Sequence, residues 1–116
     1  MVILQIIAAG EVELVSSAVV RYENSRNPFP LRRQWVDRCL HLASHFQPLS
    51  ENMRARALEL EQAGIRAVDA LHLVCAEAAE SQYFLTCDDP VIRRYQGGMQ
   101  GLNPINFVSS VTGEQP

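Results

Sequence analysis

The segment 65–79 constrains the fold of this chain more than any other part of the sequence. Its residues are apolar on nearly every side of a helix. This pattern predicts a helix that other elements cover on several sides, because a helix on a protein surface keeps one polar face. Asp69, near the start of the segment, is the conspicuous exception and therefore needs an explanation.

The rest of the chain alternates short apolar runs with helical patterns. Ser16 or Ser17 can cap a helix that continues through Glu23, and Gly10 can end an opening helix as a glycine just past its last turn. Helices are expected over 2–9, from the Ser16–Ser17 pair to Glu23, and over 31–46, 50–64, 65–79 and 89–95. Short strands are expected over 12–15, 45–49, 83–86 and 105–108.

Two details are predicted for the C-terminal third of the chain. Asp89 stands directly before Pro90, so Asp89 is expected to cap a helix whose first residue is the proline, which leaves Asp88 without a structural role. Gly97, Gly98 and Gly101 are expected to form a loop. They do not suit a phosphate-binding loop, because no strand leads into them and no helix follows.

Strands separated by helices predict an α/β fold, a three-layer α/β/α sandwich with a mostly parallel sheet. The 116 residues fit one core, so a single domain over 1–116 is expected. In open sheets of this kind, ligands gather at the carboxyl ends of the strands. A functional site is therefore expected among residues that directly follow strands or begin helices.

The composition argues against several kinds of site but does not identify the function. The net charge of -3 gives no overall attraction to nucleic acid, so phosphate binding would depend on a local group of arginines, the only basic residues in the chain. The three cysteines are far apart and form no C-x-x-C, which fits a reducing cytoplasm and argues against disulfides or a zinc knuckle. His41 and His45 have the spacing of a zinc helix, but Leu42 stands where a metalloprotease needs glutamate.

Three carboxylates lie where the sheet rule places a site. Glu23 shares a helix face with Val19 and Val20, which should pack inward, and an ion pair with Arg21 or Arg26 would explain it equally well. Asp69 could simply favour the positive end of its helix dipole. His72 and Cys75 follow Asp69 at one-turn intervals, which could imitate a mixed metal site, although core packing explains both more simply.

Asp88 completes the set of three acids. Carboxylates that converge in one cleft repel one another unless a hard cation neutralises them, and Mg²⁺ suits oxygen ligands. These residues alone therefore predict a magnesium site if Glu23, Asp69 and Asp88 meet when the chain folds.

Three stretches taken together resemble successive motifs of the PIN-domain family. They are S-S-A-V-V-R-Y-E-N at 16–24, A-V-D-A-L-H-L-V-C-A-E at 67–77 and F-L-T-C-D-D at 84–89, and L-N-P-I-N-F-V at 102–108 is similar to the family's closing strand. The resemblance implies a parallel sheet with an acidic cleft and Mg²⁺- or Mn²⁺-dependent cleavage of RNA. It also implies a toxin that a cognate antitoxin protein silences, as in many bacterial members.

By motif, the resemblance implies that Glu23, Asp69 and Asp88 are the catalytic and metal-binding carboxylates, with Asp89 as a weaker fourth metal ligand. Thr86 would line the site. For RNA binding, local arginines such as Arg21, Arg26, Arg93 or Arg94 are expected, because the overall charge is unfavourable. No segment suggests a membrane span.

The chain departs from the family pattern at its N-terminus. Members begin with a strand that ends in aspartate and lies in the middle of the sheet, whereas no Asp occurs here before Asp37. Residues 2–9 are similar to the end of the family's first long helix, so the first central strand is expected to be missing. Loss of a central strand would expose two inner sheet edges. We therefore expect the neighbouring strands to pair directly or a second copy, in a homodimer, to fill the gap.

Two other functions remain open from the sequence. The chain could be a PIN-like module without catalytic activity that binds a protein partner or another copy of itself. A small-molecule enzyme of another α/β class is less favoured, because the sequence has no phosphate loop, nucleophile elbow or dinucleotide fingerprint.

Overall fold

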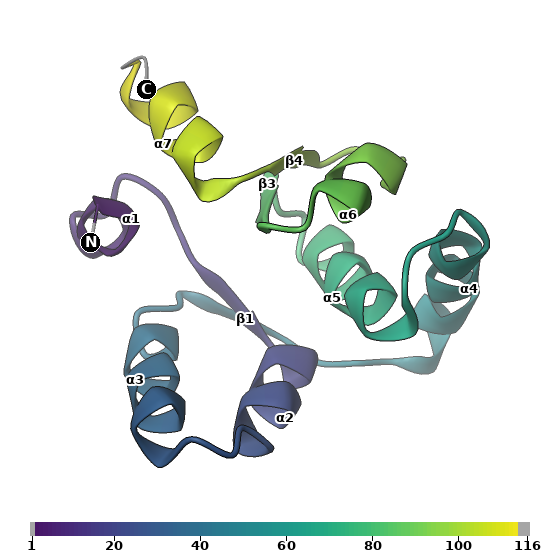
Figure 1. Cartoon of the computed structure of the whole chain (residues 1–116), viewed down its shortest axis with the longest axis horizontal. Coiled ribbons are helices and arrows are strands. Elements are labelled where there is room, and N and C mark those ends of the chain that lie inside the picture. Colours follow the sequence, from purple (N-terminus) through teal and green to yellow (C-terminus); the bar gives the residue numbers. More distant parts are fainter. Residues whose placement is uncertain (1, 114–116) are drawn as a thin grey trace.

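The computed structural model describes residues 2–113 and confirms the predicted α/β class (Figure 1). Short strands alternate with helices along the chain. In order, the elements are α1 (Val2–Ala8), β1 (Val15–Ser17), α2 (Ala18–Ser25), α3 (Pro30–Leu40), β2 (His45–Gln47), the 3-10 turn η1 (Glu51–Met53), α4 (Arg54–Gln62), α5 (Ala67–Ala78), β3 (Tyr83–Leu85), α6 (Asp89–Arg94), β4 (Gln100–Leu102) and α7 (Pro104–Thr112).

The strands form two parallel pairs. β1 pairs with β2, with Val15 opposite His45, and β3 pairs with β4, with Tyr83 opposite Gln100. The predicted parallel pairing is confirmed. Within residues 2–113 the two pairs are not hydrogen-bonded to each other, so the expectation that the strands flanking the gap pair directly is wrong for the single chain.

The N-terminal half follows its sequence signals with shifted boundaries. Gly10 has a φ of +78°, the left-handed conformation expected of a glycine after a helix. The Ser17 hydroxyl accepts a hydrogen bond from the Val20 amide and so caps α2. The first strand begins at Val15 rather than at residue 12, and α3 ends at Leu40, so Phe46 belongs to β2.

The C-terminal segment corrects two predictions. Gly101 lies in β4 and not in a loop. The expected strand over 105–108 is part of the helix α7, because Asn103 caps it by accepting a hydrogen bond from the Asn106 amide at 2.8 Å. Pro104 follows at the first helical position, where its fixed φ favours helix. The apolar run Ile105–Val108 therefore forms one face of a capped helix.

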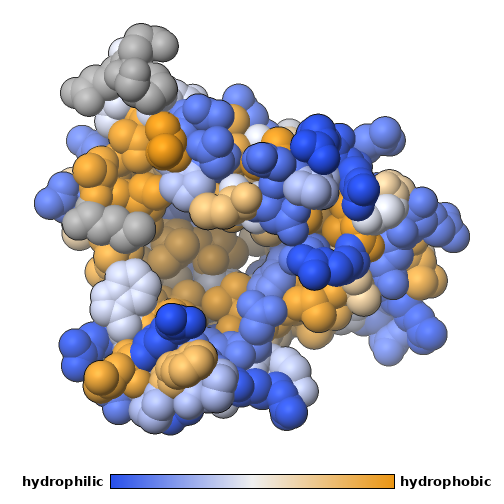
Figure 2. Space-filling view, viewed as in Figure 1, coloured by the Kyte–Doolittle hydropathy of each residue, from blue (hydrophilic) through white to orange (hydrophobic). Residues whose placement is uncertain are grey.

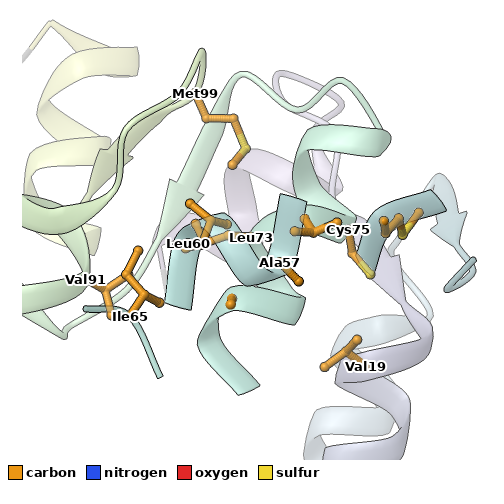
Figure 3. Close-up of a cluster of buried hydrophobic side chains, with 11 residues drawn as sticks. Val19, Ala57, Leu60, Ile65, Leu73, Cys75, Val91 and Met99 are labelled. Atoms are coloured by element: carbon orange, nitrogen blue, oxygen red, sulfur yellow. The ribbon is translucent and has the colours of Figure 1, made fainter. Parts of the chain in front are cut away.

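α5 lies at the centre of the core, as its all-round apolar pattern predicts. Ala70 and Leu73 are completely buried, and Leu60 of α4 packs against α5 from one side (Figure 3). α2 and β1 contact α5 from another side.

None of the helices within residues 2–113 combines the length and the apolar character needed to cross a bilayer.

Candidate functional site

Asp69 lies in the first turn of α5, which begins at Ala67. A carboxylate there is favoured by the positive end of the helix dipole. Its side chain is 30% exposed, and Oδ2 lies 3.5 Å from Nε of Arg66, three residues earlier. Asp69 is thus held at the exposed start of a helix whose middle, from Ala70 to Cys75, is largely buried.

Asp88 follows β3 and caps α6, which corrects the prediction that Asp89 is the cap. Its side chain accepts a hydrogen bond from the Val91 amide, and its backbone φ and ψ of -89° and 97° are extended. The Thr86 hydroxyl accepts a hydrogen bond from the Asp88 amide at 3.1 Å and so fixes this turn. With Asp88 as the cap, Pro90 is the second helical residue and not the first. A proline fits there as well, because the backbone amides of the first helical turn have no intrahelical partner. Asp89 is exposed.

A single guanidinium joins the two aspartates. Nη2 of Arg66 lies 3.4 Å from Oδ2 of Asp88, while Nε of the same side chain lies 3.5 Å from Asp69. A pocket of about 190 Å³ lies beside them and is also lined by Gly64, Pro90 and Arg94. Two carboxylates from separate elements therefore contact different nitrogens of one guanidinium at the surface.

Glu23 lies on α2, which is anchored to α3 by the buried Asn24. The Asn24 amide donates hydrogen bonds to the Arg33 carbonyl and to Asp37 Oδ1, at 3.1 and 2.9 Å. Glu23 Oε1 lies 3.3 Å from Nε2 of His72, so its partner is His72 and neither Arg21 nor Arg26.

His72 connects Glu23 to the other two acids through α5. It follows Asp69 by three residues, which places the two side chains on one face of the helix. Glu23 is therefore linked through His72 to the helix face that carries Asp69. Within residues 2–113, no group of three or more His, Cys, Asp or Glu side chains is arranged to hold a metal ion.

Two of the arginines expected to contact RNA, Arg21 and Arg26, are exposed and lie on aromatic rings. The Arg21 guanidinium is 4.5 Å from the centre of the Phe46 ring, and that of Arg26 is 5.7 Å from the centre of the Tyr22 ring. Both arginines belong to α2, the helix that carries Glu23. Positive charge and aromatic surface thus occur together on this side of the chain.

Cys75 takes no part in the site. Its side chain is buried in the core, and burial raises the pKa of the thiol above its usual range although a hydrogen bond with Ser17 opposes the shift. A thiol that stays protonated is a poor metal ligand. Cys75 therefore acts as a core residue.

Two groups important here were not singled out from the sequence. Arg66 stands three residues before Asp69, a spacing that allows contact across one helical turn and could have indicated the pair. Glu77, Arg56 and Tyr95 form a partly buried network, with Arg56 Nε donating to Glu77 Oε1 at 2.9 Å. These residues come from three separate segments, so no local pattern signals the network.

One family model matches most of the sequence. The model, PIN domain, covers residues 1–97. The chain belongs to the PIN-domain family. PIN domains are generally nucleases that typically use Mg²⁺ or Mn²⁺, bind RNA and often bind antitoxins. No curated protein and no solved structure gives a significant match to the chain.

The donor set at Asp69 and Asp88 fits the cations that PIN domains use. Both residues offer carboxylate oxygens, the ligands that Mg²⁺ and Mn²⁺ prefer. The guanidinium of Arg66 already demonstrates that one positive group can contact both carboxylates. The side chain of Arg66 is 81% exposed, so little packing holds it between them.

Proposed function

We propose that this PIN domain is a ribonuclease whose divalent cation is held by Asp69 and Asp88, with Glu23 as the third carboxylate and Asp89 as a weaker fourth. The observation that supports the proposal is the contact of Asp69 and Asp88, from the start of α5 and the turn after β3, with one guanidinium, that of Arg66. Glu23 contacts His72, which lies on the same helix as Asp69.

Asp69 and Asp88 would hold a Mg²⁺ or Mn²⁺, which would lower the pKa of a water molecule and stabilise the leaving oxygen of the phosphodiester. Thr86 keeps Asp88 in place through the hydrogen bond to its amide. The attacking water would form a new P–O bond and give up a proton to solvent as the bond to the leaving ribose oxygen breaks. The leaving oxygen takes up a proton from solvent.

The RNA is bound by exposed arginines, chiefly Arg21 and Arg26. Their guanidinium groups can contact phosphates bidentately, and the neighbouring Phe46 and Tyr22 rings offer surfaces on which unpaired bases stack. This combination suits single-stranded RNA, whose bases are free to stack. Because these contacts are arginine–phosphate ion pairs, binding should weaken as the salt concentration rises.

Cleavage of a labelled single-stranded RNA tests the proposed function directly. We expect cleavage with Mg²⁺ or Mn²⁺ and none with EDTA. The same preparation carrying Asp69→Asn identifies contamination, because cleavage by both proteins alike would show that the activity comes from elsewhere. The absence of metal-dependent cleavage across several RNA sequences would contradict the proposal.

Arg66 should compete with the metal for the two aspartates. Each exposed ion pair contributes less than about 1 kcal/mol, so Arg66→Ala should tighten Mn²⁺ binding by roughly threefold to tenfold. Isothermal titration or the electron paramagnetic resonance signal of free Mn²⁺ measures this. Arg54→Ala removes an exposed arginine of α4 and serves as the control. Unchanged or weaker binding in Arg66→Ala would show that Arg66 does not occupy the cation position.

A binding module without catalytic activity is the second candidate function. The position of Glu23 favours it, because this carboxylate contacts His72 and does not join the two aspartates. The two candidates differ in Mn²⁺ binding. A dissociation constant above about 10 mM, far weaker than functional metal sites, together with no cleavage would favour the inactive module.

The resemblance to ribonuclease toxins leads us to propose a finer role, the toxin of a toxin–antitoxin pair that acts in the cytoplasm. The three cysteines are unpaired in the structure, which agrees with a reducing compartment. Induced expression in a bacterial host should slow growth, and expression of Asp69→Asn should not. Equal growth with both proteins would contradict the toxin role.

A further inference from the structure

The helix α3 contributes little to the core. Its residues, Pro30–Leu40, include none that is fully buried, although a surface helix ordinarily packs an apolar stripe against the rest of the protein. α3 lies beside α2 at the edge of the molecule (Figure 1). Core packing therefore does not explain the large side chains at and near α3.

Two aromatic rings of this segment are open to solvent. Phe29, directly before α3, is 56% exposed, and Trp35, in its middle, is 51% exposed. The aromatic residues of the C-terminal half are instead buried or partly buried, namely Tyr83, Phe84, Tyr95 and Phe107. Exposed rings gathered on one element indicate a binding surface.

Basic and aromatic residues alternate along this helix at three-residue intervals. The four members, which we call the α3 ridge, are Phe29, Arg32, Trp35 and Arg38. Residues at this spacing are neighbours on a helix surface. Both arginines are exposed, and the Arg32 guanidinium lies 4.9 Å from the centre of the Phe29 ring. The α3 ridge thus combines positive charge with flat rings.

The positive charge of α2 and α3 is not neutralised within the protein. Residues 18–40 contain five arginines and two acids, a net charge of +3, whereas the whole chain carries -3. In the described part of the chain, none of these five arginines forms an ion pair with a carboxylate. In Figure 2, strongly hydrophilic side chains lie beside apolar ones on the lobe at the lower left that contains α3. A polyanion is therefore the ligand that complements this surface.

We propose that the α3 ridge binds an unpaired segment of RNA, whose bases stack on the two rings and whose phosphates contact the two arginines. Exposed rings suit a single strand, because the bases of a duplex are already stacked on one another. An acidic polypeptide would satisfy the arginines but would leave the rings without a stacking partner. The inference extends the RNA binding proposed for Arg21 and Arg26 and rests on it, so RNA binding is measured apart from cleavage.

The fluorescence of Trp35 tests the proposal without a label, because it is the single tryptophan of the chain. Bases stack on exposed indole rings, so RNA bound to the α3 ridge should quench this emission. The titration uses an unpaired RNA of about ten nucleotides in EDTA, which prevents metal-dependent cleavage, at about 50 mM salt. We expect saturable quenching with a dissociation constant on the order of 10 μM. Emission that stays unchanged across the titration would overturn the proposal.

Three matched probes separate base stacking from a general attraction of polyanions. An oligomer with abasic sugars keeps the phosphates but lacks the bases, and it should bind at least about fivefold more weakly. A duplex of the same sequence should quench Trp35 less than the single strand does. Polyglutamate should leave the emission unchanged. Equal affinity for the abasic oligomer, or equal quenching by polyglutamate, would show that charge alone attracts the ligand and would overturn the proposal.

Variants of the α3 ridge give a second readout, the salt dependence of binding, measured by the anisotropy of labelled RNA. Arg32→Ala should make the slope of log K against log salt less negative by about 0.7, the value for one phosphate contact in a single strand. Trp35→Ala should weaken binding about fivefold or more and keep the slope, because it removes stacking and no charge. Arg54→Ala and Leu58→Ala, at exposed positions of α4, are the matched controls and should bind normally.

The ridge variants should remain folded, because α3 contains no fully buried residue. An unchanged slope in Arg32→Ala, or a change of the same size in Arg54→Ala, would overturn the proposal. The outcome is distinguishable from that of the ribonuclease proposal. RNA binding through the α3 ridge without any cleavage would contradict only the ribonuclease, whereas cleavage with normal RNA affinity in Arg32→Ala and Trp35→Ala would contradict only the ridge.

Discussion

Replacing Asp69 with asparagine is expected to lower metal-dependent RNA cleavage by about 100-fold or more. Asparagine keeps the size of the side chain but removes the negative charge that would hold the cation beside Asp88. A cation in such a site supplies several kcal/mol of transition-state stabilisation, and each 1.36 kcal/mol corresponds to a tenfold change in rate, so about 100-fold is a modest estimate. Initial rates on a labelled RNA measure the effect.

The Asp69→Asn protein should remain folded, which makes the loss of activity interpretable. Among residues 2–113, the ion-pair partner of Asp69 is an exposed arginine, and such pairs contribute little to stability. Asp88→Asn should behave similarly, because asparagine caps helices as well as aspartate does and α6 would keep its cap. Glu61→Gln, an exposed change of acid to amide on α4, is the control and should cleave normally. Full activity in Asp69→Asn would remove this residue from the site.

Replacing Glu77 with alanine is expected to lower the free energy of unfolding by about 3 kcal/mol. Glu77 accepts hydrogen bonds from Arg56 and Tyr95, and its side chain is only 22% exposed. Without it, the Arg56 charge and the Tyr95 hydroxyl lose their partner in a partly buried place, and hydrogen bonds to charged groups contribute about 1.5–3 kcal/mol each. Urea denaturation measures the change, and a loss below about 1 kcal/mol would contradict it.

The network of Glu77, Arg56 and Tyr95 also predicts that the free energy of unfolding depends on pH. The hydrogen bond from Arg56 lowers the pKa of Glu77 below its ordinary 4.5, despite opposing desolvation. The stability from this carboxylate is therefore present above about pH 4.5 and is lost as pH falls through the lower pKa of the folded state. Glu77→Gln should remove this part of the acid dependence, whereas Glu61→Gln should leave it unchanged. An identical acid profile in Glu77→Gln would contradict the assignment.

The sequence determined the features that depend on neighbours along the chain. The apolar pattern of 65–79 predicted the helix α5 at the core, the Ser16–Ser17 pair contained the residue that caps α2, and Gly10 marked the end of α1. The motif order identified the family that the model over residues 1–97 confirms. Periodicity and capping act over one or two helical turns, so a single sequence contains them in full.

Short segments were predicted less well, because their local signals allow more than one structure. The apolar run at 105–108 fits a strand or a helix, and the cap at Asn103 settles it as helix. The choice between Asp88 and Asp89 as a cap depended on the hydrogen bond from the Asp88 amide to Thr86. In both cases, one side-chain hydrogen bond decided between two structures that the local sequence allowed equally well.

Only the tertiary structure decided which charged groups meet. Arg66 bridges Asp69 and Asp88, and Glu23 lies against His72, because α2, α5 and the turn after β3 pack together from distant parts of the chain. The division of the strands into two pairs likewise depends on which strands meet. Such contacts depend on how whole elements pack in three dimensions, and spacing along the sequence does not specify them.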